Sequence, residues 1–260
     1  MPIIKLKSKI EEYKIRASKS DINEMSGRTH NPSLTKYVLN NIAKEVKNIS
    51  GTIVDIGCGD GSLYRILKNK KQNIKSYIGI LPTNEECLRL SKEMKKFSPV
   101  VKIKKGFSDC LPLPENTADL VIINGVILIL KNKEEVLRTI IDIKRICREG
   151  AYIFIGEVPF IDEMKNINYG DSIIGWLLHV LINKGFNLFL KKIIYLIKCL
   201  ITDEVFMITH KRIISFEVEE FVKILSEFGF EVIKSFPHKE IDSNGNECIS
   251  KTRYDYLVKI

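Results

Sequence analysis

The sequence lacks the residue patterns that build metal sites and disulfide frameworks. Its six cysteines lie far apart without a CxxC pair, and its four histidines are not paired at a ligand spacing. Structural zinc sites place two Cys or His ligands within a few residues of one another. We therefore expect reduced thiols in a cytoplasmic protein that holds no metal ion.

Long apolar segments are also missing from the sequence. The first residues, MPIIKLKSKIEEYK, carry charge throughout, which predicts that no signal peptide is present. The longest uncharged run, residues 172–183, is too short for a membrane-spanning helix, which needs about 20 apolar residues. These absences favour a cytoplasmic protein that does not span a membrane.

Acidic residues are outnumbered, because 41 Lys and Arg stand against 32 Asp and Glu. The formal net charge of +9 favours an anionic partner, either nucleic acid or an acidic lipid or glycan. The lysines are dispersed along the chain, and no RNA-binding signature accompanies them. Nucleic acid is therefore the less favoured partner, although an RNA acceptor stays open.

Strand-like and helix-like periods alternate along most of the chain. Strands are predicted at 52–57, 75–80, 100–106, 118–125, 151–158, 231–238 and 253–260. Helices are predicted at 33–46, 62–69, 84–97, 133–150 and 217–230. This alternation predicts an α/β fold with a doubly wound, mostly parallel sheet, and the last two strands suggest an antiparallel edge.

A glycine-rich loop follows the first predicted strand in the stretch IVDIGCGDGSL, residues 53–63. It lacks the lysine of a phosphate-binding P-loop, and its spacing is GxGxG rather than the GxGxxG of dinucleotide sites. Asp55 and Asp60 would repel a diphosphate and attract an ammonium or sulfonium group. S-adenosylmethionine fits these requirements.

With this loop, the segment GFSDCLPLPENTADLVIINGVI (106–127) and EVEEFVKILSEFGFEVIKS near the end, the sequence resembles class I S-adenosylmethionine-dependent methyltransferases of type 11. The resemblance spans about residues 33–160 and 215–260. It implies a seven-stranded Rossmann-like sheet whose last strand is antiparallel, with S-adenosylmethionine as the cofactor. It also implies that the methionine moiety lies over Asp55, Gly57, Cys58 and Gly59, with Gly61 in the same loop.

Further cofactor contacts are implied by the same resemblance, with two departures from the usual pattern. Leu81 stands where an acid usually binds the ribose hydroxyls, so an acid introduced there should tighten binding. Phe107 stands where an acid often faces the adenine, which leaves Phe107 to stack on the ring and Asp109 to reach its amino group. Ser108 and Asn124 complete the expected cofactor set.

Candidate catalytic residues follow from the chemistry of methyl transfer to an alcohol, which needs a base for the hydroxyl proton. In this fold the acceptor groups come from the carboxyl ends of the strands. Glu157, after the fifth strand, is the first candidate, and His238 is the second. His30 and His179 are weaker alternatives, and Arg28 could pair with the methionine carboxylate.

The segment 171–201 is the most apolar part of the chain, and its lysines fall on one helical face opposite a wide apolar face. We divide the chain into an N-terminal segment or lid (1–32), a methyltransferase core (33–160 and 215–260) and a helical insertion (161–214). The insertion either caps the acceptor site or contacts an anionic membrane from the cytoplasmic side.

The insertion and the closing segment also resemble those of bacterial methyltransferases associated with cell-surface polysaccharide synthesis. We therefore expect O-methylation of a sugar hydroxyl on a surface glycan or lipid-linked precursor. Methylation of a small or lipidic metabolite or of RNA, and a non-catalytic binding protein that keeps the fold, are the alternatives.

Overall fold

The computed structural model describes residues 32–70, 72–96, 98–130, 132–160, 173–201, 214–242 and 245–260. These ranges include nearly all of the predicted core. The predicted N-terminal segment lies outside the described residues except for Pro32, and so do the two ends of the insertion.

The core is a sheet of seven strands in the order β3-β2-β1-β4-β5-β7-β6. Neighbours among β1 to β5 run parallel, whereas β7 runs antiparallel to both β5 and β6. The predicted seven-stranded sheet with an antiparallel last strand is thereby confirmed, and the sheet is mixed. The strands are β1 (Gly51–Ile56), β2 (Ile74–Leu81), β3 (Val101–Lys105), β4 (Ala118–Asn124), β5 (Cys147–Pro159), β6 (Glu231–Ile241) and β7 (Glu247–Lys259).

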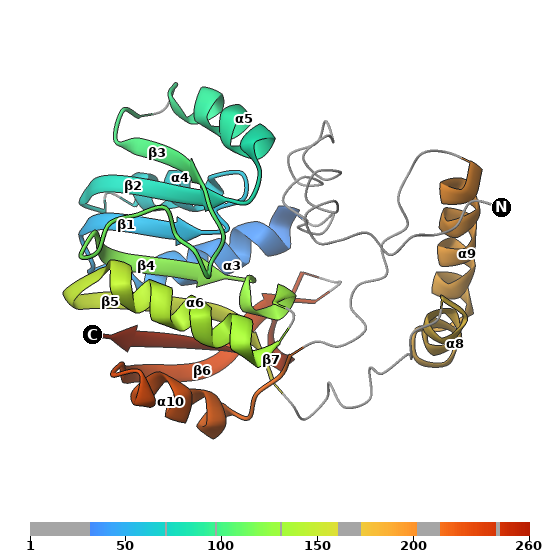
Figure 1. Cartoon of the computed structure of the whole chain (residues 1–260). Helices are drawn as coiled ribbons and strands as arrows, with labels where there is room; N and C mark the ends of the chain where they lie inside the picture. Colours follow the sequence, from blue (N-terminus) through green and yellow to red (C-terminus); the bar gives the residue numbers. More distant parts are fainter. Residues whose placement is uncertain are drawn as a thin grey trace.

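Helices cover both faces of this sheet because its central strands are apolar on both sides. In β1, Ile53 packs toward α3 (Pro32–Glu45), α4 (Ser62–Asn69) and α5 (Asn84–Met94), as do Leu120 and Ile122 of β4. The alternate residues Val54 and Ile56 pack toward α6 (Lys133–Ile146) and α10 (Val218–Glu227). A short 3-10 helix, η1 (Ile127–Ile129), follows β4. The result is a three-layer, doubly wound core (Figure 1).

One boundary differs from the sequence prediction, which continued the helix at 133 as far as residue 150. Helix α6 ends at Ile146, and Cys147 already pairs with Ala118 of β4. Gly150 has a φ of 76°, and its N–H donates to the carbonyl of Ile260 over 2.9 Å. Pairing with β4 and with the chain end therefore overrides the helical pattern of these residues.

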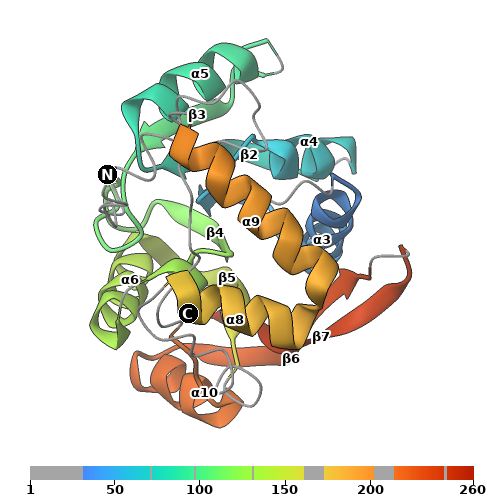
Figure 2. The same cartoon turned by 90° about the vertical axis from the view of Figure 1, so that its right-hand side faces the viewer.

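The predicted insertion contains two helices, α8 (Ile173–Lys184) and α9 (Phe186–Ile201). They pack against each other and are separated by Gly185, whose φ of 85° suits glycine. Figures 1 and 2 show this pair apart from the sheet, on the side toward which the parallel strands point. No described helix is long and apolar enough to cross a membrane.

At the amino ends of the central strands, one carboxylate near the start of β4 forms contacts with its two neighbouring strands. Asp119 accepts the N–H of Thr52 over 2.7 Å and pairs with Arg148 of β5, also over 2.7 Å. A Cβ atom at Gly51 would clash with this carboxylate, so the position requires glycine. Burial would raise the pKa of Asp119, but the Thr52 hydrogen bond and Arg148 lower it overall. Asp119 of β4 therefore links the amino ends of β1 and β5 through Thr52 and Arg148.

Replacing Asp119 with alanine should destabilise the fold without affecting cofactor affinity. Loss of the charge-assisted hydrogen bonds should lower the free energy of unfolding by about 2 kcal/mol. Glu220→Ala, which breaks an exposed pair with Lys133, is the matched control and should cost less than about 1 kcal/mol. Urea denaturation measures both, and equal costs would contradict the role assigned to Asp119.

Candidate active site

The loop between β1 and α4 has a backbone that only glycine adopts without strain. Gly57, Gly59 and Gly61 have φ values of 76°, 56° and 73°. A Cβ atom at Gly57 would lie 2.7 Å from Cγ2 of Val126, in the loop after β4. The N–H of Gly57 donates to the carbonyl of Ile80 over 2.9 Å. The loop is thus fixed against the ends of β2 and β4, and its three positions with positive φ carry no side chain.

Both acids of this loop have partners within the fold. Asp55 is buried and accepts a hydrogen bond from the hydroxyl of Tyr77 on β2. Asp60 accepts the N–H of Ser62 over 3.0 Å and its hydroxyl over 2.5 Å, which closes a local turn just before α4. The sequence argument treated them as attractors of a cation, but the structure also gives each one a role in shaping the loop.

Cys58 serves as a packing residue beneath the loop. Its side chain is buried against Gly79, where a Cβ atom would lie 2.6 Å from Sγ. Burial, with the charge of Asp55 adding to it, raises the pKa of Cys58 well above its usual value. The thiol therefore stays protonated and does not act as a nucleophile.

The end of β2 carries no exposed acid at the expected ribose position. The Leu81 side chain is 5 % exposed and packs in the core on the α3–α5 face. An acid introduced at this position would enter an apolar environment, so the expected gain in ribose binding does not follow. Thr83 and Glu86 form the N-terminal cap of α5, and Glu85 in the same turn is exposed.

The turn after β3 places its three predicted cofactor contacts, Phe107, Ser108 and Asp109, in different environments. Phe107 is 41 % exposed, so its ring is accessible for stacking. Ser108 is buried, with its hydroxyl 2.9 Å from that of Thr139 on α6. Asp109 pairs with Arg138 of the same helix over 3.4 Å. Only Phe107 therefore presents an exposed side chain that the fold does not already use.

A polar cluster lies at the carboxyl ends of β4 and β5. Glu157 accepts a hydrogen bond from Asn124 Nδ2 over 2.9 Å through one carboxylate oxygen. Its other oxygen pairs with Arg253 of β7 over 2.6 Å. The side chain of Glu157 is 17 % exposed, and the Oδ1 atom of Asn124 is buried without a hydrogen-bond partner among the described residues. The side chain of Asn124, which was predicted to contact the cofactor, therefore binds Glu157 in this structure.

Asp255 holds this cluster in place from β7. Its buried carboxylate accepts the backbone N–H of Glu157 over 2.8 Å and lies 3.0 Å from His238 Nδ1. Glu157 has a φ of 58°, an uncommon value for a non-glycine residue. The strand registers shift at Glu157 in β5 and at His238 in β6, as in β-bulges, which re-aim side chains near functional sites.

His238 is almost fully enclosed, with 3 % of its side chain exposed. Burial would lower its pKa, but the hydrogen bond and the charge of Asp255 outweigh burial and raise it above 6.5. Because the ring is buried and bound to Asp255, His238 supports the cluster rather than contacting an acceptor. Glu157, at 17 % side-chain exposure, is the more accessible member of the predicted catalytic pair.

The glycine loop and the polar cluster are neighbours. Gly57 contacts Val126, and a Cβ atom at the adjacent Gly125 would lie 3.5 Å from Glu157 Oε1. The structure therefore brings Glu157 beside the loop that was assigned to the cofactor. Arg28 and His30 lie outside the described residues, and the side chain of His179 is not described.

Sequence reasoning missed Asp255 and Arg253, which organise the cluster. Asp255 stands between Tyr254 and Tyr256 in a segment that was predicted only as an edge strand. An acid at an inward position of a buried strand is a signal for a paired carboxylate, because unpaired charges are rarely buried. The pairing with β5 that gives Asp255 its partner cannot be seen from that segment alone.

The raised pKa of His238 predicts that part of the folding stability depends on pH. The protonated ring is favoured in the fold, so its contribution is fully present below pH 6.5. It should be lost as the pH rises through the folded-state pKa. The difference in unfolding free energy between the wild type and His238→Gln should therefore be largest below about pH 6.5 and shrink as the pH rises above it. A difference independent of pH in urea titrations would contradict this coupling.

Comparison with known proteins agrees with this geometry. Residues 54–155 match a family model described as a methyltransferase domain. No curated protein sequence matches the chain. A structure from Haloferax volcanii, a complex of the Trm112 methyltransferase activator with a methyltransferase, matches with a TM-score of 0.61 at 14% identity, over 97% of this chain and 97% of that one.

Two further solved structures share the fold. N-methyltransferase NodS from Bradyrhizobium japonicum, in complex with S-adenosyl-L-homocysteine, has a TM-score of 0.57 at 11% identity, over 96% of this chain and 97% of that one. An S-adenosylmethionine-dependent methyltransferase from Methanosarcina mazei has a TM-score of 0.53 at 19% identity, over 84% and 96%. Residues 54–155 therefore match a methyltransferase domain, and the chain shares its fold with S-adenosylmethionine-dependent methyltransferases.

Proposed function

We propose that the enzyme transfers the methyl group of S-adenosylmethionine to a hydroxyl group, and that the acceptor is a sugar of a surface glycan or lipid-linked precursor. The observation that carries this proposal is the carboxylate of Glu157. It is partly exposed, fixed by Asn124 and Arg253, and adjacent to the glycine loop.

The glycine loop fits the methionine end of the cofactor. Its positive φ values at Gly57, Gly59 and Gly61 leave the backbone open to close approach by a ligand. The exposed ring of Phe107 offers a surface on which the adenine can stack. When bound, S-adenosylmethionine supplies an electrophilic methyl group on a sulfonium that leaves readily.

A carboxylate beside the cofactor suits an alcohol acceptor. As the new carbon–oxygen bond forms and the carbon–sulfur bond breaks, the hydroxyl must release its proton. Glu157 can take that proton and orient the hydroxyl, while neutral S-adenosylhomocysteine is the other product. Asn124 and Arg253 keep the carboxylate in one position, which favours an in-line approach of the acceptor oxygen.

The sugar class rests on the polar character of this cluster and on the resemblance of the insertion to those of polysaccharide-associated methyltransferases. A lipidic metabolite is the second candidate acceptor. The observation in its favour is the series of exposed apolar side chains on α8 and α9, which include Ile174, Ile182 and Phe186.

Gly59→Ala should abolish detectable binding of S-adenosylmethionine in calorimetry. The positive φ of Gly59 adds about 1–2 kcal/mol of backbone strain for alanine, which should move the loop out of the conformation that a ligand would contact. Gly150→Ala is the matched control, because Gly150 has a φ of 76° with no atom near its Cβ direction and lies far along β5 from the loop. The control should lose similar stability but keep its affinity. Unchanged affinity of a folded Gly59→Ala protein would refute the site assignment.

Glu157→Gln should lower kcat by about 100-fold or more and leave the affinity for S-adenosylmethionine unchanged, because the amide cannot accept the proton. The acceptor for this assay is found by screening nucleotide-linked and lipid-linked sugars for release of S-adenosylhomocysteine. Glu149→Gln, an exposed residue at the other end of β5, serves as the control. A Glu157→Gln enzyme with wild-type kcat would remove Glu157 from the reaction.

A further inference from the structure

The α8–α9 hairpin, residues 173–201, exposes apolar side chains in regular stripes. On α8, Ile174, Leu178 and Ile182 are 70%, 50% and 77% exposed. Their spacing of four residues places them on one helical face. On α9, Phe186, Leu190 and Ile194 have the same spacing and are 62%, 45% and 59% exposed. Exposed apolar surface of this extent marks an interaction site.

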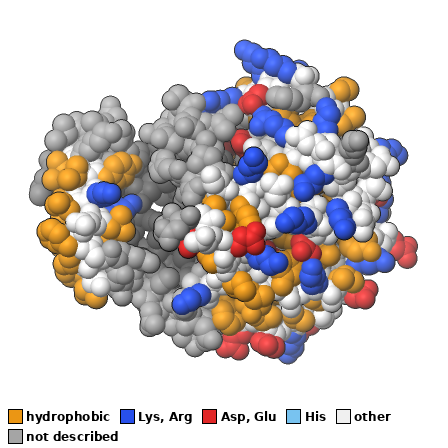
Figure 3. Space-filling view, turned by 180° about the vertical axis from the view of Figure 1, so that it is seen from behind, with side chains coloured by type: hydrophobic (Ala, Val, Ile, Leu, Met, Phe, Trp, Pro, Cys, Tyr) orange, Lys and Arg blue, Asp and Glu red, His pale blue; other side chains and the backbone are white. Residues whose placement is uncertain are grey.

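Packing between the two helices accounts for only part of the apolar surface. Val180 of α8 is buried, and Phe189, Ile193 and Leu196 of α9 are half-buried, on the helical face next to the exposed stripe. The hairpin therefore has a small interior of its own. Its stripes remain exposed among the described residues, as the apolar surface of the hairpin in Figure 3 shows.

The charge of the hairpin points to one kind of partner. Residues 173–201 contain four lysines and no acidic residue. Lys191 is exposed and Lys192 half-exposed, beside the half-exposed phenol of Tyr195. Apolar stripes bordered by lysines, with an aromatic ring that has a polar end, are the features of helices that lie in a membrane interface. A surface that binds a protein does not need to lack acidic residues. Their absence from residues 173–201 therefore favours an anionic membrane over a protein partner.

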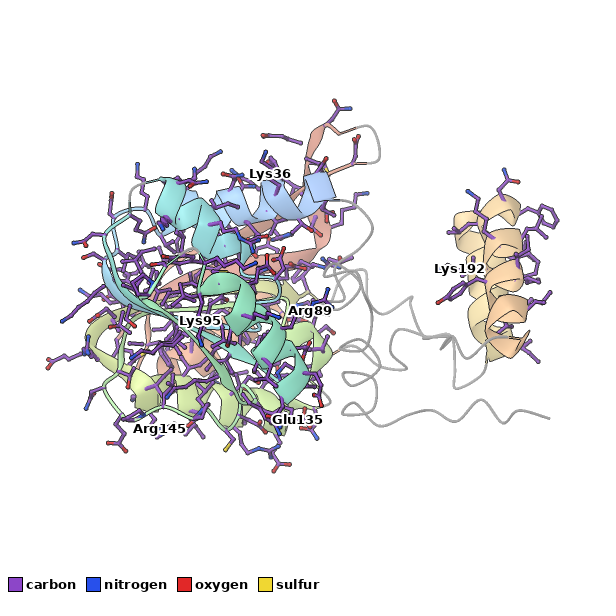
Figure 4. The ribbon with its side chains drawn as sticks, turned by 90° about the horizontal axis from the view of Figure 1, so that it is seen from above. Lys36, Arg89, Lys95, Glu135, Arg145 and Lys192 are labelled. Carbon is purple, nitrogen blue, oxygen red and sulfur yellow. The ribbon has the colours of Figure 1, made fainter. Side chains whose placement is uncertain are left out.

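The hairpin lies on the side of the molecule that holds the candidate site residues at the carboxyl ends of the parallel strands. In Figures 1 and 2 it stands beyond the carboxyl ends of the parallel strands. In Figure 4, Arg89 of α5 and Glu135 of α6 lie on the side of the core toward Lys192, whereas Lys95 and Arg145 lie farther from it. A surface bound by the hairpin would therefore face the carboxyl ends of β1, β4 and β5.

We propose that the α8–α9 hairpin docks on an anionic phospholipid surface, with its apolar stripes in the acyl boundary and its lysines among the head groups. Docking holds the carboxyl edge of the sheet toward the bilayer. The docking proposal rests on the proposed function in one respect only, namely that the acceptor would be presented at the membrane. Each helix lies in the interface plane, because neither is long enough to span the bilayer.

The test uses the full-length protein and vesicles of phosphatidylcholine alone or mixed with phosphatidylglycerol. The protein should co-sediment with the mixed vesicles, and less so as salt concentration rises. Trp176 is the single tryptophan of the chain and lies within α8. In a Trp176→Phe/Leu178→Trp protein, the single tryptophan stands at the exposed position of Leu178, and its emission should shift to shorter wavelength on binding, which reports on the hairpin itself rather than on the core.

Two variants with the same change in charge separate docking from general attraction. Lys191→Glu/Lys192→Glu should weaken binding by more than about 20-fold, since each lysine near an anionic surface strengthens binding about fivefold. Lys95→Glu/Lys96→Glu changes two exposed lysines at the far end of α5 and should bind as the wild type does. Ile182→Ser/Ile194→Ser, at exposed positions, should abolish the tryptophan shift without loss of folding.

Three results would overturn the proposal: no binding to mixed vesicles at low salt, binding without a tryptophan shift, or equal loss of binding in both lysine pairs. The first would leave the hairpin as a cap over the acceptor site. Calorimetry with S-adenosylmethionine on the same proteins keeps the two proposals apart. Cofactor binding without vesicle binding refutes docking alone, whereas vesicle binding without cofactor binding refutes the proposed function alone.

Discussion

The polar cluster around Glu157 depends on the hydrogen bonds of one buried carboxylate, that of Asp255. It joins three strands, since it lies on β7, accepts the N–H of Glu157 from β5 and binds His238 of β6. Without such an acceptor, the positive φ of Glu157 would leave a strained backbone with an unpaired N–H. Asp255, 98 positions later in the chain, therefore fixes the backbone of Glu157 through one hydrogen bond, while Asn124 and Arg253 hold its carboxylate.

The sheet is antiparallel only at β7, which pairs with β5 on one side and β6 on the other. A parallel neighbour of β5 would require another crossover helix, whereas β7 returns directly from β6 as a hairpin partner. The antiparallel register places Arg253 opposite Pro159 and Tyr254 opposite Val158, just past the bulge. Arg253 thereby reaches Glu157, and the apolar strand end becomes a polar cluster.

Much of the core could be predicted from the sequence because its signals are local. The alternation in residues 52–57 and the glycines that follow are sufficient to predict β1 and the loop. Signals that depend on distant partners were harder to interpret. The segment 147–150 has a helical pattern but pairs with β4 and the chain end, and Leu81 occupies the position of an expected acid but packs into the core. Gly185, which divides the insertion into two helices, was a local signal that the apolar pattern around it obscured.

The two ends of the parallel strands differ in backbone strain. Strained residues lie at the carboxyl ends, and stabilising contacts at the amino ends can offset their cost. At the carboxyl ends of the strands, Gly57, Gly125 and Glu157 all have positive φ values. The loops that hold these residues lie against one another. Each non-glycine residue in such a conformation costs on the order of 1–3 kcal/mol, which must be offset elsewhere. The amino edge supplies ordinary stabilising contacts, among them the Asp119 carboxylate that binds Thr52 and Arg148. Because β4 carries Asp119 at one end and Asn124 at the other, the strand that secures the fold also positions Glu157. A change in the loop after β4 should therefore affect the glycine loop and the Glu157 carboxylate together, since Val126 lies against the first and Gly125 lies beside the second.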